Sequence, residues 1–152
     1  MDLYSLLTVF IMSVSIGILY RIPRASLFYA SFVGTGAYFT QQLSILVSIH
    51  WVAASFFGSV AAAFLSEVFA RRWKKPATIY LIPGFIPLVP GREAYLAMTY
   101  LVKGQYEQGA AMAMRALLTA SAIAFGIFVC VSFFRFMINR KIGSHTKNVR
   151  KN

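Results

Sequence analysis

Arg92 and Glu93 directly follow a stretch that contains three prolines at 83, 87 and 90, and their charged side chains could bind an anion or carry a proton. Ionisable residues within a membrane are costly and mark substrate or proton paths by default. An arginine attracts a carboxylate, and a glutamate can carry a proton. Arg92 is therefore a candidate carboxylate-binding residue and Glu93 a candidate proton site. The alternative is a structural charge pair at the membrane interface.

Glu67 is the second candidate proton site, because it lies one helical turn before the basic stretch RRWKK at 71–75. The simpler interpretation pairs Glu67 with the arginines of that stretch. Other reactive groups are scarce, with four acidic residues and two histidines in 152 positions. We find no phosphate-binding glycine loop, no His/Cys set with metal spacing and no nucleophile–base arrangement. The sequence therefore predicts no enzyme, no cofactor and no metal site.

The uncharged stretch ATIYLIPGFIPLVPG, residues 77–91, must position these side chains. Proline lacks an N–H group, clashes with the preceding helical turn and restricts the residue before it. Three prolines within eight positions exclude a continuous α-helix from 82 to 91. At membrane depth, irregular backbone persists only where it is buried in protein or lines a water-filled cavity. Interrupted helices of this kind indicate transport sites, and the alternative is a proline-rich surface loop.

A helix that begins again after the prolines would present free N–H groups and the positive end of its dipole to an anion such as a carboxylate. Residues 92–102 are expected to form this second half-helix. The residues predicted to line the substrate path are Pro83, Gly84, Pro87, Pro90 and Gly91.

The composition is that of an all-α integral membrane protein, with 59% hydrophobic and 12% charged residues. A soluble domain carries about 25% charged residues, and a membrane span needs about 20 apolar residues. The uncharged run 25–66 is too long for one span, and its most polar point is Thr40-Gln41-Gln42. A break at that point gives about five transmembrane segments, the fourth of which carries the prolines. They lie near 3–20, 25–41, 44–70, 77–102 and 111–137.

The net charge of +11 comes from lysines and arginines clustered at the ends of apolar runs. Cytoplasmic loops of membrane proteins carry such an excess. Five segments place Arg21, Arg24, the stretch 71–75 and the basic C-terminal residues on one side, with Asp2 on the other. The N-terminus is therefore predicted outside and the C-terminus in the cytoplasm. Residues 1–141 form the transmembrane domain and 142–152 a basic cytoplasmic tail, and nucleic-acid binding is excluded.

A stripe of small residues follows the third segment, with Ala54, Gly58 and Ala62 at four-residue spacing. Such stripes let helix backbones approach closely in a membrane. The sequence predicts a packing face here, and its partner is either another helix of this chain or another subunit.

Two stretches, KKPATIYLIPGFIPLVPGREAY and the later GQYEQG, resemble the signature of the threonine/serine exporter family. The spacing of prolines and glycines between Pro83 and Gly91 is the most specific part. The resemblance extends over nearly the whole chain, which is similar to the small subunit of the split, two-component form of this transporter.

This resemblance implies proton-coupled export of small amino acids or related small carboxylates across the bacterial inner membrane. It also implies a partner, a second membrane subunit that carries the other half of the exporter. The competing hypothesis is a membrane scaffold or assembly protein that transports nothing itself.

Overall fold

The computed structural model describes the backbone of residues 3–149 and the side chains of residues 3–137. Every regular element in this part of the chain is helical. Asp2 and residues 150–152 of the proposed tail lie outside the described residues. The elements are α1 (Leu3–Leu19), α2 (Arg24–Leu46), α3 (Trp51–Trp73), α4 (Thr78–Phe85), the 3-10 turn η1 (Ile86–Leu88), α5 (Gly91–Val102) and α6 (Tyr106–Val149).

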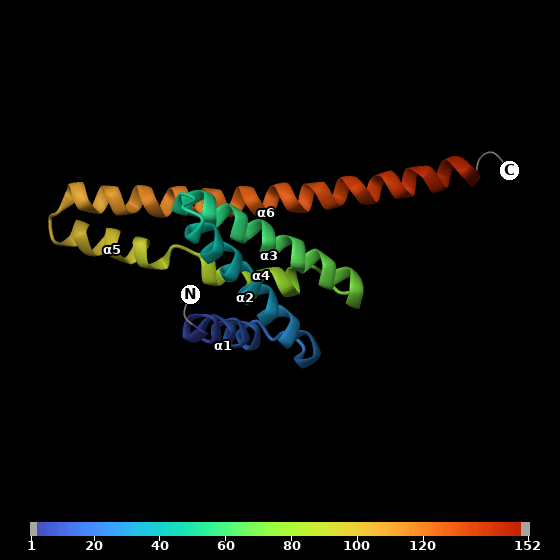
Figure 1. Cartoon of the computed structure of the whole chain (residues 1–152), viewed down its shortest axis with the longest axis horizontal. Helices are drawn as coiled ribbons and strands as arrows, with labels where there is room; N and C mark the ends of the chain where they lie inside the picture. Colours follow the sequence, from blue (N-terminus) through green and yellow to red (C-terminus); the bar gives the residue numbers. More distant parts are fainter. Residues whose placement is uncertain (1–2, 150–152) are drawn as a thin grey trace.

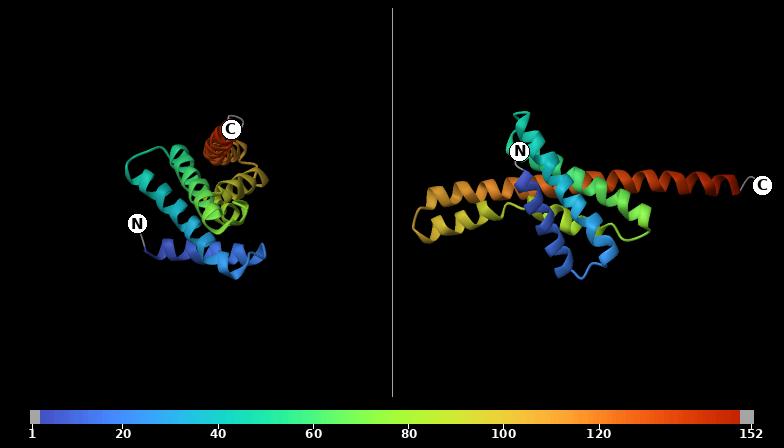
Figure 2. Two further views of the ribbon diagram at one scale, coloured as in Figure 1. Left: turned by 90° about the vertical axis from the view of Figure 1, so that its right-hand side faces the viewer. Right: turned by 60° about the horizontal axis from the view of Figure 1, so that its bottom comes forward.

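The helices form a bundle from which one hairpin projects (Figures 1 and 2). Helix α2 packs between α1 and α3 and also contacts α4. Helix α6 lies against α3 along its middle and against α5 in its first part, and α5 and this part of α6 extend beyond the α2–α3 turn. A buried core that includes Ala30, Val33, Ala62 and Tyr80 joins α2, α3 and α4.

Helix α2 runs through Gln41, so the expected break at residues 40–42 is wrong. The polar side chains there are satisfied within the bundle: the Gln41 amide donates to Ser55 Oγ at 2.9 Å, and the Gln42 amide donates to the Tyr38 hydroxyl. The Thr40 hydroxyl donates to a carbonyl of the preceding turn. The chain turns between α2 and α3 instead, where Ser48 adopts a positive φ of 61°.

The proline-rich stretch interrupts the helical backbone between α4 and α5. Helix α4 continues through Pro83 to Phe85, and one 3-10 turn follows. Val89 is extended, with φ −61° and ψ 133°, and Pro90 has φ −75° and ψ 59°. The Gly91 N–H donates to the Val89 carbonyl at 2.8 Å, which makes Pro90 the centre of an inverse γ-turn. The α-helix begins again at Gly91.

The small-residue stripe of α3 packs inside this chain, which answers the question of its partner. Ala54 and Ala62 are fully buried, and Gly58 is buried as well. A Cβ atom on Gly58 would lie 3.1 Å from the Ala37 carbonyl oxygen of α2. On the other side, a Cβ atom on Gly126 of α6 would lie 2.9 Å from the Phe56 carbonyl oxygen of α3. A Cβ atom at Gly126 would force a shift of the backbone and one at Gly58 a smaller shift, so the two glycines let α3 pack closely between α2 and α6.

Two of the described helical stretches are long and apolar enough to cross a membrane, Trp51–Trp73 and Tyr106–Met137. The uncharged part of α6, residues 116–134, measures about 28 Å at the helical rise of about 1.5 Å per residue. At one end of it, the Arg115 guanidinium lies 5.9 Å from the centre of the Trp51 ring. At the other end, the Arg71 guanidinium lies 4.4 Å from the Phe134 ring. These contacts align the ends of α3 with the ends of the uncharged stretch.

Candidate functional site

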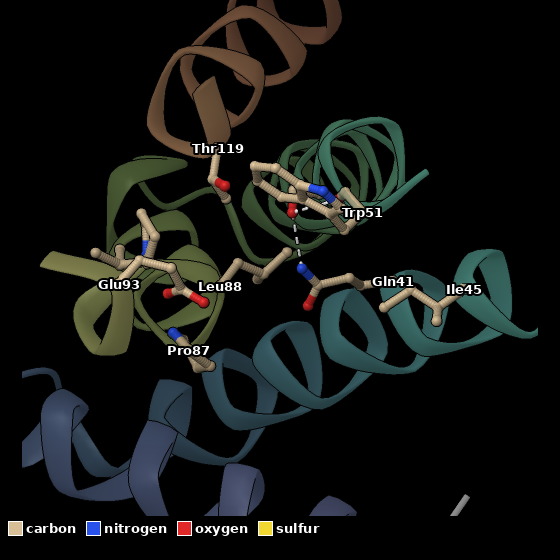
Figure 3. Close-up of a pocket in the computed structure, with 10 residues that line it drawn as sticks. Gln41, Ile45, Trp51, Pro87, Leu88, Glu93 and Thr119 are labelled. Atoms are coloured by element: carbon tan, nitrogen blue, oxygen red, sulfur yellow. Dashed lines mark hydrogen bonds between the residues drawn. The ribbon is translucent and has the colours of Figure 1, made fainter. Parts of the chain in front are cut away.

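A cavity of about 210 Å³ lies where the interrupted helix meets α2, α3 and α6 (Figure 3). It sits at the end of the bundle where α2 turns into α3, opposite the basic stretch 71–75. Because residues far apart in the sequence meet here, the site exists only in the folded chain. Its lining residues are Gln41, Ile45, Trp51, Ser55, Pro87, Leu88, Val89, Pro90, Glu93 and Thr119.

The proline-rich stretch builds one wall of this cavity. Pro87 lies in the 3-10 turn, and the γ-turn at Pro90 redirects the chain before α5 begins. Glu93 therefore falls in the first turn of α5 and faces the cavity, where it is the one acidic lining residue. A carboxylate in the first turn is also favoured by the helix dipole.

The opposite wall is formed by α2 and α3. The Gln41 amide donates to Ser55 Oγ at 2.9 Å, and the Ser55 hydroxyl donates to the Trp51 carbonyl at 3.0 Å. These bonds fix the Gln41 side chain, which extends toward the middle of the cavity from the side opposite the Glu93 carboxylate (Figure 3). From α6, Thr119 adds a hydroxyl that donates to the Arg115 carbonyl at 2.9 Å.

The start of α5 supplies hydrogen-bond donors beside the same cavity. The first N–H groups of an α-helix have no partner within the helix. The Gly91 N–H bonds to the Val89 carbonyl, and the Ala94 N–H closes the first helical bond with Pro90. The N–H groups of Arg92 and Glu93 lie between them. One acidic group, fixed amide and hydroxyl groups and free N–H groups together suit a small zwitterion.

Among the residues expected to line a path, Pro87 and Pro90 line the cavity, and so does Glu93, the candidate proton site. Pro83 and Gly84 are buried away from it. A Cβ atom on Gly84 would meet the Val33 side chain at 2.5 Å, so Gly84 packs α4 closely against α2.

Gly91, Arg92 and Glu67 do not line the cavity. Gly91 and Arg92 are exposed, and a Cβ atom on Gly91 would touch nothing within 4 Å. Glu67 forms an ion pair of 3.3 Å with Arg71 at the opposite end of α3. The roles predicted for Arg92 and Glu67 stay predictions.

Seven cavity residues were not predicted as site residues, and four of them carry polar groups: Gln41, Trp51, Ser55 and Thr119. Gln41 gave a signal, since it interrupts a long apolar run, but this signal was interpreted as a loop. From the sequence alone, Ser55 is explained by helix packing beside the small-residue stripe, and Trp51 by an aromatic position at the membrane interface. Thr119 gave no signal, because a threonine in a spanning helix usually bonds to its own backbone.

Comparison with known proteins gives a family match over residues 5–133, to the family described as Threonine/Serine exporter, ThrE. A protein of Haemophilus influenzae, described as an uncharacterized protein, is 26% identical over 101 residues, which cover 66% of this chain and 34% of that protein. The chain thus matches about a third of the length of that relative. No solved structure matches it.

The family match and the apolar helices indicate a membrane protein concerned with transport rather than with an enzymatic reaction. The match covers the proline-rich stretch and every residue that lines the cavity. Because it extends over far more than half of the described residues, the chain belongs to the threonine/serine exporter family.

Proposed function

We propose that this chain is a membrane subunit of a secondary transporter that exports small amino acids of the threonine/serine type or related small carboxylates. The observation that carries the proposal is the cavity at the helix interruption, which Glu93 lines together with Gln41, Ser55 and Thr119. The volume of about 210 Å³ suits a small solute. The family supplies the class of transported compound.

The two charged ends of an amino acid have complementary groups in this arrangement. The ammonium group meets the Glu93 carboxylate, in a charge-assisted hydrogen bond that is stronger than a neutral one. The carboxylate meets the free N–H groups at the start of α5, where the helix dipole favours an anion. Arg92, exposed in the same turn, adds positive charge nearby.

Glu93 also offers a means of coupling transport to protons. A carboxylate can bind either a proton or a substrate ammonium group, and each occupant excludes the other. If the site faces the two sides of the membrane in turn, this exclusion exchanges one substrate for one proton. Glu67 is the other candidate proton site, but its bond to Arg71 and its distance from the cavity favour Glu93.

In the membrane, we place five segments: α1, α2, α3, the interrupted α4–α5 pair and α6. The uncharged stretch of α6 between Arg115 and Arg135 matches the hydrocarbon thickness of about 30 Å. The basic residues near Arg21 and at 71–75 then face the cytoplasm of a bacterium, with the N-terminus outside. Residues 1–141 form the membrane domain, and 142–152 form a basic cytoplasmic tail.

We further propose that a second membrane subunit completes the transporter. The chain matches about a third of the length of its Haemophilus influenzae relative, which leaves most of that protein without a counterpart here. The exposed apolar side chains of α1 and α6 offer surfaces for lipid or for this partner; they include Leu7, Ile11, Phe125 and Phe128.

The proposal can be tested with a fluorescent reporter that the chain already contains. It has two tryptophans, and Trp51 lines the cavity while Trp73 does not. In a Trp73→Phe background, threonine or serine should change the Trp51 emission in a saturable way. The protein should be purified from native membranes together with whatever co-purifies with it.

The decisive variant is Glu93→Gln, and its matched control is Glu67→Gln. Glu93→Gln should weaken binding of the amino acid about 10- to 100-fold, because a hydrogen bond to a charged group is worth about 1.5–3 kcal/mol. Glu67→Gln should leave binding within twofold of the parent. Equal effects of the two variants, or a Trp51 signal that does not respond to any small amino acid or carboxylate, would refute the proposed site.

A further inference from the structure

A second polar cluster lies at the other end of the bundle, where α2 begins and α3 ends. It consists of Ser26 of α2, Lys75 of the α3–α4 connection and Tyr80 of α4. The Lys75 ammonium donates to Ser26 Oγ at 2.7 Å, and the Tyr80 hydroxyl donates to the same oxygen at 3.4 Å. Ser26 and Tyr80 are buried, and Lys75 is partly buried.

Local backbone geometry directs Lys75 into this cluster. Helix α3 ends at Trp73, and Lys74 after it adopts the left-handed conformation with φ 52° and ψ 43°. The Lys75 N–H then donates to the Ala70 carbonyl at 3.0 Å, which is the 6→1 bond of a Schellman motif. Pro76 follows and cannot continue the helix. Two adjacent lysines are thereby separated, since Lys74 is exposed while Lys75 reaches Ser26.

The cluster holds more hydrogen-bond donors than acceptors. An ammonium group has three donors, and a serine hydroxyl has one donor besides its acceptor sites. Lys75 donates to Ser26 Oγ, and the hydroxyls of Ser26 and Tyr80 share one hydrogen bond, so two ammonium N–H groups have no acceptor among the described residues. The one ion pair among those residues joins Arg71 to Glu67, so Lys75 has no carboxylate partner there.

The position of the cluster relates it to the cavity. Ser26 and Gln41 lie on the same helix, about 22 Å apart at the helical rise of about 1.5 Å per residue. Val33, which lies between them on α2, is fully buried in the core. The bundle therefore has a cavity near one end and a closed, positively charged contact at the other.

We propose that Lys75, Ser26 and Tyr80 form a cytoplasmic site for the carboxylate group of the substrate, closed in this structure by the bond between Lys75 and Ser26. When α2 and α4 separate at this end, the ammonium and the two hydroxyls are released together. A carboxylate supplies the two acceptor oxygens and the negative charge that the cluster lacks. The inference rests on the proposed function and adds where the substrate is first bound before it reaches the cavity.

The test compares two neighbouring lysines. Lys75→Gln and Lys74→Gln each remove one positive charge from the same surface, but Lys75 alone belongs to the cluster. The variants should replace the gene in its native host, so that any partner subunit is present. Efflux of threonine or serine is then measured as a function of the internal concentration, and Trp51 emission is titrated on the purified protein.

Lys75→Gln should raise the internal concentration that gives half-maximal efflux at least tenfold. Lys74→Gln should leave it within twofold, and Lys75→Arg, which keeps the charge, within threefold. Ser26→Ala removes one hydroxyl of the site but keeps the cation, and it should raise this concentration less than Lys75→Gln does. In all four variants, binding reported by Trp51 should equal that of the parent.

Three results would overturn the inference: equal efflux curves for Lys75→Gln and Lys74→Gln, a fall in maximal efflux with an unchanged half-maximal concentration, or a larger shift for Ser26→Ala than for Lys75→Gln. The second and third results would give Lys75 a structural or closing role only. A parent protein without saturable efflux and without a Trp51 response would instead refute the proposed function, and the inference with it.

Discussion

Replacing Pro87 and Pro90 together by alanine tests whether the helix interruption itself makes the site. In the structure, Val89 and Pro90 are the two non-helical residues between η1 and α5. An extended residue advances the chain by about 3.3 Å and a helical residue by about 1.5 Å. Val89 is extended, whereas the γ-turn at Pro90 is already compact, so converting both residues to helix would draw α5 about 2 Å toward α4. It would also rotate α5, by about 100° for each residue added to the helix.

This displacement should abolish the site without unfolding the protein. Alanine is favoured over proline by about 3 kcal/mol per helix-interior position, and the double variant regains two N–H donors. Close packing of α5 on α6 opposes this gain, since α5 cannot move without disturbing it. The two helices are so close that a Cβ atom on Gly109 would lie 3.2 Å from the Leu101 nitrogen. A carboxylate moved by about 2 Å and rotated with α5 cannot keep a hydrogen bond whose length is about 2.7–3.2 Å. Efflux should fall at least tenfold.

The assay is threonine or serine efflux from the native host, with the amount of folded protein measured in the same membranes. Pro76→Ala is the matched control, because Pro76 lies in the α3–α4 connection and does not line the cavity. Ile86→Leu serves as a second control, which keeps the apolar character and both prolines. Normal efflux by the double alanine variant, at a normal amount of folded protein, would show that the interruption is a surface loop and that transport uses another site.

Three further predictions follow from the packing and the charge distribution. Gly126→Ala should lower the free energy of unfolding by about 1 kcal/mol, because overpacking costs about 1–3 kcal/mol and alanine regains about 1 kcal/mol in a helix. Gly91→Ala is the control, because its Cβ atom would meet nothing within 4 Å. Equal thermal unfolding of the two variants in detergent would contradict this prediction. With Cys130 replaced, single cysteines at Asp2 and Asn152 should react with an impermeant thiol reagent from opposite sides of the membrane, and labelling from the same side would exclude five segments. A second membrane protein should co-purify in mild detergent, whereas gradient-driven flux by this chain alone in liposomes would exclude an obligatory partner.

The class of fold could be predicted from the sequence, because the length of each apolar run and the basic residues at its ends are visible without knowledge of the tertiary structure. Helices α1, α3 and α6 overlap the predicted segments 3–20, 44–70 and 111–137, although α3 begins only at Trp51 and α6 runs from Tyr106 to Val149. The α2–α3 turn could not be located this way, since it depends on where polar side chains find partners. Gln41 looks like a loop residue in the sequence, but Ser55, fourteen positions later, accepts its hydrogen bond and keeps it within α2.

Part of the candidate site could be predicted for a similar reason. Proline restricts its own backbone, so the sequence alone predicts that Pro87 and Pro90 interrupt the helix and that Glu93 lies just after the interruption. The other walls come from three separate helices, and only tertiary packing brings Gln41, Ser55 and Thr119 to Glu93. No periodicity distinguishes Thr119 from the other small residues of α6. Likewise, only the structure separates Lys75 from Lys74.

Helix α6 is continuous from Tyr106 to Val149, a length of about 66 Å for 44 residues. Such a rod behaves as a lever when it tilts. A rotation of about 10° about its midpoint moves its two ends by about 6 Å in opposite directions, given this length. The α5–α6 hairpin at one end and the basic residues at the other would therefore swing in antiphase. Substrate binding that moves one end of α6 would thus move the other end, on the opposite side of the membrane, without rearranging the side chains between them.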